Sequence, residues 1–316
     1  MDYTKIIEIV RSAKKFVLRD DLSHEIRMKG EADFVTGVDL SISEYIKEKL
    51  HEIAPEIGFM SEEEEPGKLA PRRWILDPVD GTTNLVFDYR MSSISLGLCD
   101  GGKSVFGVVY NPYTDEIFTA VRGEGAYLNG KRLSVVDRNP HDSLVEFGAG
   151  STRKHEADEA FRIGKEVFMH CLDLRRICSS ALAICFIAAG RINGYFEKVI
   201  KPWDYAAASL ILEEAGGSLC DWTGAPLPFD RPSGIIAGSP KTYEYLKSVL
   251  LKQPVLFETK LASAFVRTRT PYSPYQRKKC GQRANLTKKN KKFPTSPKRT
   301  SQPAAHDKKE ASKLKV

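Results

Sequence analysis

The sequence predicts a mixed fold in which helices pack on β-sheets, of the α/β or α+β class. Helical periodicity opens the chain, short strands follow, and helices then alternate with strands as far as residue 251. Helices and strands that mix in both halves of a chain favour layers of helix on sheet over an all-helical or all-strand fold. The 316 residues are 41% hydrophobic and 9% aromatic, which excludes a wholly disordered or fibrous chain.

Two amphipathic helices and one strand are predicted first. Residues 2–19 and 39–53 have apolar side chains at helical spacing, and Pro55 ends the second helix because proline cannot continue it. The apolar run 74–76 precedes an Asp-Pro pair, so we predict a strand that ends there at a turn.

An antiparallel meander and then an alternation of elements follow. The meander strands are residues 93–99, 104–111 and 116–122, separated by the turn sequences Asp-Gly-Gly and Asn-Pro. Later strands are predicted at residues 144–147, 194–197, 218–221 and 234–237, and later helices at residues 154–170, 178–189, 205–215 and 241–251.

The net charge of +7 is unevenly distributed along the chain. Residues 251–316 hold 18 Lys and Arg against three Asp and Glu, whereas residues 1–250 hold 30 against 38. Residues 267–316 are rich in Lys, Arg, Pro, Ser, Thr and Gln, so they cannot bury enough apolar surface to offset the entropy of ordering. We therefore predict a compact domain over residues 1–250 and a basic, disordered tail over residues 251–316.

The sequence pattern also argues against secretion and against insertion into a membrane. The longest apolar run, residues 181–189, is nine residues long, well short of the roughly 20 that span a bilayer. Charged residues interrupt the N-terminal segment, and six cysteines form no CxxC pair. We expect a cytoplasmic protein with reduced thiols, no signal peptide and no membrane partner.

The eight residues 77–84, Asp-Pro-Val-Asp-Gly-Thr-Thr-Asn, carry the sharpest chemical signal. Asp77 and Asp80 at a strand end can converge on cations, and Gly81 permits close backbone approach. A helix that starts near Thr82 would add free N–H groups for an anion. Asp-Pro and Asp-Gly are also ordinary turn dipeptides, but the whole string after a strand favours a site for cations and phosphate.

Two further acidic positions have both a functional and a structural interpretation. Asp204, in the string Trp-Asp-Tyr-Ala-Ala-Ala, lies where a helix cap would lie. Residues 62–65 are four consecutive Glu, typical of a solvated face, yet a Glu at a strand end could complete a metal cluster. Oxygen ligands without His or Cys nearby would select Mg²⁺ or Mn²⁺ over zinc.

These motifs together resemble the inositol monophosphatase family of magnesium-dependent, lithium-sensitive phosphatases, in its bacterial form. Residues 77–84 resemble the first family signature, and residues 203–208 with the following Glu-Ala-Gly-Gly resemble the second. Residues 59–63 are similar to a family strand that ends in Gly-Glu-Glu, with Ser61 in place of the Gly, and residues 32–39 to a family Asp-Leu-Val-Thr-x-x-Asp stretch. The resemblance covers residues 1–250 and implies the layered α-β-α-β-α sandwich of the inositol monophosphatase and fructose-1,6-bisphosphatase type, as a homodimer.

The resemblance also implies a set of site residues around two or three Mg²⁺ ions, with Mn²⁺ as the alternative. The implied metal ligands are Glu62, Asp77, the backbone carbonyl of Val79, Asp80 and Asp204. The implied catalytic residues are Glu62, Thr82 and Asp39, of which Thr82 and Asp39 would position and help deprotonate the attacking water. The implied substrate-binding residues are Gly81 and Thr82, through backbone N–H groups, with Asp80, Asp204 and the polyol-binding Glu197.

The implied reaction is Mg²⁺-dependent hydrolysis of a small phosphate monoester by in-line attack of a metal-activated water, without a phosphoenzyme. Myo-inositol monophosphate is the first substrate candidate, among phosphorylated polyols and sugars. Fructose-1,6-bisphosphatase, histidinol-phosphatase and 3'(2'),5'-bisphosphate nucleotidase activities stay open, because substrate loops vary more than the metal site.

Three further alternatives concern single features of the chain. Glu63 remains open as the metal ligand in place of Glu62. Residues 178–181, Cys-Ser-Ser-Ala, stand where inositol-specific relatives commonly have Gly-Thr-Ala-Ala. In a different class of function, the basic tail would bind nucleic acid nonspecifically and with strong salt dependence.

Overall fold

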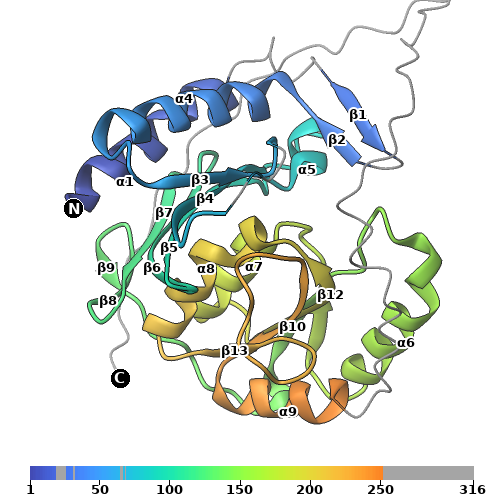
Figure 1. The fold of residues 1–316 in the computed structure, drawn as a ribbon. Coiled ribbons are helices and arrows are strands. Elements are labelled where there is room, and N and C mark those ends of the chain that lie inside the picture. Colours follow the sequence, from blue (N-terminus) through green and yellow to red (C-terminus); the bar gives the residue numbers. More distant parts are fainter. Residues whose placement is uncertain (19–25, 31–32, 65–66, 68, 252–316) are drawn as a thin grey trace, which may run out of the picture. The chain divides into compact units, whose positions relative to one another are not determined.

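The computed structural model describes residues 1–251 apart from 19–25, 31–32, 65–66 and 68. The predicted tail, beyond Leu251, lies outside the described residues. Contacts divide the chain into residues 1–257 and 258–316, and all elements below belong to the first part (Figure 1).

A seven-stranded sheet and its helical cover make up the first half. Its strands, in spatial order, are β3 (Gly58–Ser61), β4 (Arg72–Asp80), β5 (Ser93–Asp100), β6 (Lys103–Asn111), β7 (Glu116–Val121), β8 (Gly125–Leu128) and β9 (Lys131–Arg132). Helices α1 (Tyr3–Ser12), α2 (Lys14–Val17) and α4 (Gly37–Ile53) cover one face, where Ile42 and Ile46 meet Trp74 and Phe106. Apolar side chains at helical spacing thus form the first helical layer.

A five-stranded sheet with its own helical cover forms the second half. Its strands lie in the order β11 (Asp173–Arg175), β10 (Leu144–Phe147), β12 (Gly194–Ile200), β14 (Ser233–Gly238) and β13 (Ser218–Cys220). Strand β10 is parallel to both of its neighbours, and β14 is antiparallel to both of its own. Helices α6 (Ala157–Phe168) and α9 (Pro240–Leu250) pack on one face, where Val167 and Leu246 join Phe196 and Ile236 in one apolar cluster.

Helices α7 (Ser180–Ala188) and α8 (Pro202–Glu214) fill the layer between the two sheets. Both are buried nearly all round, because side chains from the two sheets pack on them. The contact of α8 with the first sheet is close: a Cβ on Gly107 would lie 2.5 Å from the carbonyl oxygen of Ala207. Small residues on both sides therefore let α8 approach the backbone of β6, and this seats the start of α8 against the sheet.

The predicted α-β-α-β-α order of layers is confirmed, with some differences in the elements. The first helix breaks at Ala13, and the strand expected to stop at Leu76 continues as β4 to Asp80. The hairpin of β1 (Arg27–Gly30) with β2 (Asp33–Val35) and the short strand β11 were not predicted, because each is too short to show a period.

Two expectations about location and redox state can be compared with the described residues. Within them, no helix combines the length and the apolar composition that crossing a membrane requires. The five cysteines of this part of the chain are free thiols, and the sixth, Cys280, lies outside it.

Candidate functional site

Asp77 and Asp80 lie on β4, where the strand contains a β-bulge. Asp77 pairs with Ser95 of β5 and Asp80 with Ser93, so four residues of β4 oppose three of β5. In a regular strand, residues three apart point to opposite faces, and the extra residue at the bulge brings them to the same face. The bulge, and not a strand end, explains how these two aspartates converge.

Glu62 reaches the same place from the neighbouring strand. Strand β3 runs parallel to β4, with Ser61 opposite Leu76, and the N–H of Glu62 donates to the carbonyl of Leu76 over 3.2 Å. Parallel strands end at the same edge of a sheet, so the residue after β3 lies beside Asp77. Burial is the first cause of the raised pKa of Asp77, and the charge of Glu62 is the second.

Asp39 and Thr82 meet beside this edge. Asp39 is the third residue of α4 and forms a capping box with Thr36, whose N–H and hydroxyl donate to its Oδ2 over 2.8 and 2.5 Å. Its other oxygen, Oδ1, lies 3.2 Å from the hydroxyl of Thr82, which also lies 3.0 Å from the carbonyl oxygen of Val79. The cap thus orients Asp39 toward the threonine at the start of α5 (Thr82–Val86).

Asp204 has both of the roles that its sequence allows. Its Oδ2 accepts the N–H of Lys201 over 2.6 Å at the start of α8, which is the capping role. The charges of Asp80 and Glu62 also raise its pKa, together with the dominant effect of burial. Asp204 therefore caps its helix and belongs to the acidic cluster as well.

We define the acidic cluster as Glu62, Asp77, Asp80, Asp204 and Asp39. Burial and neighbouring carboxylates raise the pKa of Asp77 well above its usual range, and the four others all contribute to that shift. Burial raises the pKa of Asp39 to about 7, and that of Asp80 to about 6 in spite of four hydrogen bonds to its carboxylate. Buried like charges of this kind are stabilised by protons or by cations.

The cluster fits a hard divalent cation by the chemistry of its donors. It offers only carboxylate oxygens and the carbonyl of Val79, with no sulfur or imidazole among them, which suits Mg²⁺ or Mn²⁺. In the part of the chain that the structure describes, no three acidic, His or Cys side chains already stand in the closed geometry of a metal site. Coordination would therefore draw the carboxylates closer together.

Gly81 occupies a backbone position that excludes other residues. Its φ of +87° lies in the left-handed region, and a Cβ there would meet the carbonyl oxygens of Met91 and Cys178 at 3.1 and 3.2 Å. Both the conformation and the space at this position therefore require glycine, where the sequence predicted only a close backbone approach. The resulting turn opens α5, whose first residue is Thr82.

Glu197 lies on the second sheet, yet close to the cluster. Its carboxylate accepts the hydroxyl of Tyr195 over 2.6 Å and rests on Gly148, where an added Cβ would lie 1.8 Å from its Oε2. Burial raises its pKa, and the charge of Asp80 adds to that effect. Asp80 of the first sheet and Glu197 of the second therefore lie near enough for their charges to interact.

Reasoning from the sequence singled out residues 178–181 only for their departure from inositol-specific relatives, and it missed their contacts with Asp80 and the position of Glu146. The hydroxyl of Ser179 and the N–H groups of Ser180 and Ala181, at the start of α7, all donate to Asp80. Glu146, on β10, contacts the same loop through the N–H of Ile177. An acidic residue within the apolar strand 144–147 was the available signal for this last position.

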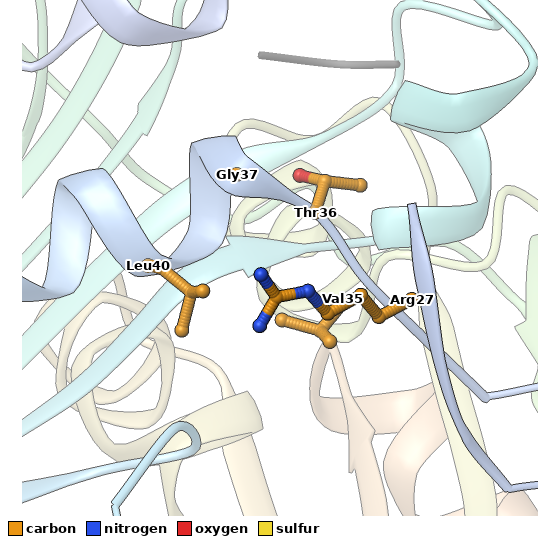
Figure 2. Close-up of a pocket in the computed structure, with 5 residues that line it drawn as sticks. All are labelled: Arg27, Val35, Thr36, Gly37 and Leu40. Atoms are coloured by element: carbon orange, nitrogen blue, oxygen red, sulfur yellow. The ribbon is translucent and has the colours of Figure 1, made fainter. Parts of the chain in front are cut away.

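A small hollow lies at the start of α4, beside the cap of Asp39. Figure 2 shows its lining, with the guanidinium of Arg27 between the side chains of Leu40 and Val35. Thr36 and Gly37 complete the lining, and no carboxylate of the acidic cluster contributes to it. The hollow is therefore separate from the acidic cluster, although Thr36 touches both.

Comparison with known proteins supports the class that the fold and the cluster define, which is that of phosphatases with metal-dependent catalysis. The model of the Inositol monophosphatase family matches residues 3–253. The Nus factor SuhB of Pasteurella multocida is 37% identical over 248 residues, covering 77% of this chain and 91% of that protein. The Inositol-1-monophosphatase of Rhizobium meliloti is 34% identical over 251 residues, covering 78% and 94%.

Solved structures agree with the family match. The extragenic suppressor protein suhB from Bartonella henselae has a TM-score of 0.75 at 31% identity, covering 80% of this chain and 100% of that one. The Thermotoga maritima IMPase has a TM-score of 0.71 at 26% identity, covering 80% and 98%. The chain belongs to the inositol monophosphatase family.

Proposed function

We propose that this protein is a Mg²⁺-dependent phosphatase that hydrolyses a small phosphate monoester, with myo-inositol monophosphate as its substrate and a homodimer as its working form. The observation that carries the proposal is the convergence of five carboxylates, of which Asp39, Asp77 and Asp80 are buried, beside the hydroxyl of Thr82. The relative from Rhizobium meliloti that is named for inositol monophosphate supports the choice of substrate.

The cation would be held by Glu62, Asp77, Asp80, Asp204 and the carbonyl of Val79. The preference for Glu62 over Glu63 rests on the pKa values that each charge affects. Glu62 adds to the raised pKa of both Asp77 and Asp204, whereas Glu63 has a larger effect than Glu62 on the pKa of Asp39. Bound Mg²⁺ would lower the pKa of a water and neutralise charge on the reacting phosphate oxygens.

The protein's own groups would orient the water and the phosphate. Thr82 would accept and pass on the proton of the attacking water, because its hydroxyl already donates toward Asp39. Asp39 suits the role of acceptor at neutral pH, since burial raises its pKa to about 7. The backbone N–H groups of Gly81 and Thr82, at the start of α5, would bind phosphate oxygens, and Glu197 would accept substrate hydroxyls.

The test is phosphate release measured with and without Mg²⁺ on wild type, Asp77→Asn and Asp204→Asn. Each substitution should lower activity by roughly 10²–10³-fold, the usual effect of removing one preorganised electrostatic partner. Asp100→Asn, at the exposed end of β5, is the matched control. Unchanged phosphate release in Asp77→Asn would show that the site is wrongly assigned.

The substrate is tested by a panel under the same conditions. Inositol monophosphate should give the highest kcat/KM among inositol phosphate, fructose 1,6-bisphosphate, histidinol phosphate and adenosine 3',5'-bisphosphate. A higher value for any other member would replace inositol monophosphate as the substrate. Light scattering of the purified protein tests the homodimer.

The basic tail favours a second function, nonspecific contact with nucleic acid. Residues 251–316 carry 18 Lys and Arg against three Asp and Glu, and such a charge excess binds phosphate backbones with strong salt dependence. The full chain should bind DNA or RNA at low salt, and a chain ending at residue 250 should lose this binding but keep phosphatase activity. Equal binding by both chains would exclude the tail as the binding segment.

A further inference from the structure

Glu146 is a buried carboxylate that the proposed mechanism does not use. It lies on β10 between Val145 and Phe147, and only 2% of its surface is exposed. Its Oε1 accepts the N–H of Ile177 over 2.9 Å, and its Oε2 is buried without a hydrogen-bond partner among the described residues. Burying a carboxylate in an apolar strand is costly unless hydrogen bonds compensate it, so the contact with Ile177 matters to the fold of the loop.

The loop that Glu146 holds contains a strained residue. Cys178 has a φ of +56°, in the left-handed region, although it is not a glycine. That conformation costs about 1–2 kcal/mol for a residue with a Cβ, and it persists only where neighbours hold the backbone. The peptide groups of Ile177 are held from two sides, by Glu146 at the N–H and by Asn84, whose amide donates to the carbonyl over 2.6 Å.

The residues after Cys178 hold Asp80. The hydroxyl of Ser179 donates to Asp80, and so do the N–H groups of Ser180 and Ala181, over 3.2 and 2.9 Å. These donors follow the left-handed residue directly, so the path of the chain at Cys178 sets where they point. A change in that turn would move all three donors together.

We propose that Glu146 is a positioning residue, which fixes the left-handed turn at residues 177–178 so that the start of α7 holds Asp80 in the orientation that binds the divalent cation. The chain of contacts runs from Glu146 through Ile177 and Cys178 to Ser179 and then to Asp80. This inference rests on the proposed function, because it gives Asp80 the role of a metal ligand. It adds a residue on the second sheet to the determinants of metal affinity.

Direct binding of Mn²⁺, measured by isothermal titration on the full chain, tests the inference without using activity. Glu146→Ala should weaken the affinity by about tenfold or more, the usual effect of losing a group that orients a metal ligand. Glu146→Gln keeps an acceptor for the N–H of Ile177 and should keep most of the affinity. Glu48→Gln, on the exposed face of α4, is the control for a change of charge alone.

A double-mutant cycle with Cys178→Gly tests whether Glu146 acts on Asp80 through the turn at Cys178. Glycine adopts a left-handed conformation without the cost of a Cβ, so the turn should then depend less on Glu146. We expect Glu146→Ala to reduce Mn²⁺ affinity much less in the Cys178→Gly background than in wild type. Equal losses in both backgrounds would overturn the inference, as would an unchanged affinity in Glu146→Ala.

The remaining outcomes are also distinct. A raised KM with unchanged Mn²⁺ affinity would assign Glu146 to the substrate and overturn the positioning role. Circular dichroism and thermal melting of each variant without metal check that the fold is intact. If Glu146→Ala fails to fold, Glu146→Gln supplies the result, because a tenfold loss of Mn²⁺ affinity in a variant that keeps the acceptor for Ile177 would overturn the inference. Failure of the proposed function is separate, since Asp77→Asn would then leave both phosphate release and Mn²⁺ binding unchanged.

Discussion

The two sheets bring carboxylates to the same region, but they hold them in different ways. At the edge of the first sheet, Asp77 lies among four other acidic residues, whose charges add to the effect of burial in raising its pKa. On the second sheet, burial is again the main cause of the raised pKa values of Glu146 and Glu197, but each of these carboxylates also accepts hydrogen bonds from neighbouring groups. We propose that the first edge, a concentration of negative charge, holds a cation, and that the carboxylates of the second sheet support a loop and contact the substrate.

This difference predicts that changes at the first edge affect catalysis most. Thr82→Ala should lower kcat by roughly 10²–10⁴-fold, the usual contribution of a group that assists proton transfer, because it removes the hydroxyl next to Asp39. Thr82→Ser keeps that hydroxyl and should stay within about tenfold of wild type. Steady-state kinetics with saturating Mg²⁺ measures both, and equal losses in the two variants would contradict the role of the hydroxyl.

Gly81→Ala should come next in size. A Cβ there would be strained by the left-handed φ and crowded by the carbonyls of Met91 and Cys178, so we expect a loss of stability of about 1–3 kcal/mol together with reduced activity. Chemical denaturation gives the free energy of unfolding. Gly101→Ala is the matched control, since its φ is also positive but no atom lies within 4 Å of the added Cβ. A similar fall in activity for both variants would contradict the importance of close approach at Gly81.

The pH dependence of stability, compared with and without Mg²⁺, should distinguish the charge concentration from the supports. The folded-state pKa of Asp39 is about 7, above its usual value of 3.8, so the folded protein binds this proton more tightly than the unfolded chain. Its stabilising contribution is complete below pH 3.8 and is lost as the pH rises through 7. The pKa values of Asp77, Asp80 and Asp204 are also raised in the folded protein, so their contributions to stability are likewise lost as the pH rises.

Melting curves between pH 5 and 8 test this expectation. The metal-free protein should melt at lower temperature as the pH rises, by about 2–4 °C for each kcal/mol lost. Saturating Mg²⁺ should remove the part of that slope that comes from the acidic cluster, because the cation stabilises its ionised carboxylates. The part that comes from Glu146 and Glu197, whose pKa values burial also raises, should remain. Parallel slopes with and without Mg²⁺ would show that the carboxylates of the acidic cluster do not bind the cation together.

The smallest effect is expected for Glu197→Gln on the second sheet. Its carboxylate already accepts the hydroxyl of Tyr195, and we expect it to contact substrate hydroxyls and not the cation. The variant should raise KM for inositol monophosphate by about tenfold, as expected for one charged hydrogen bond, and leave the Mg²⁺ dependence unchanged. A matching shift in the midpoint of Mg²⁺ activation would place Glu197 with the first edge instead.

Much of the fold could be predicted because periodicity and turn residues are local signals. The predicted strand 144–147 has the same first and last residues as β10. The predicted helix 39–53 corresponds to α4, which begins two residues earlier. The predicted strand ended at Leu76, whereas β4 continues to Asp80. An Asp-Pro pair usually ends a strand, and the bulge that lets β4 continue depends on pairing with β5. The hairpin β1–β2 and strand β11 were too short to show a pattern.

The sequence by itself determined the family, the acidic residues of the contiguous motif and the close backbone approach at Gly81, because each depends on neighbours along the chain. Only the tertiary structure placed Asp204 near the charges of Asp80 and Glu62, brought Ser179 to Asp80, and brought Glu146 to the N–H of Ile177. These contacts join residues far apart in the sequence, through the register of β10 and the docking of α7 and α8 between the sheets. Local patterns carry no information about such distances, which packing alone sets.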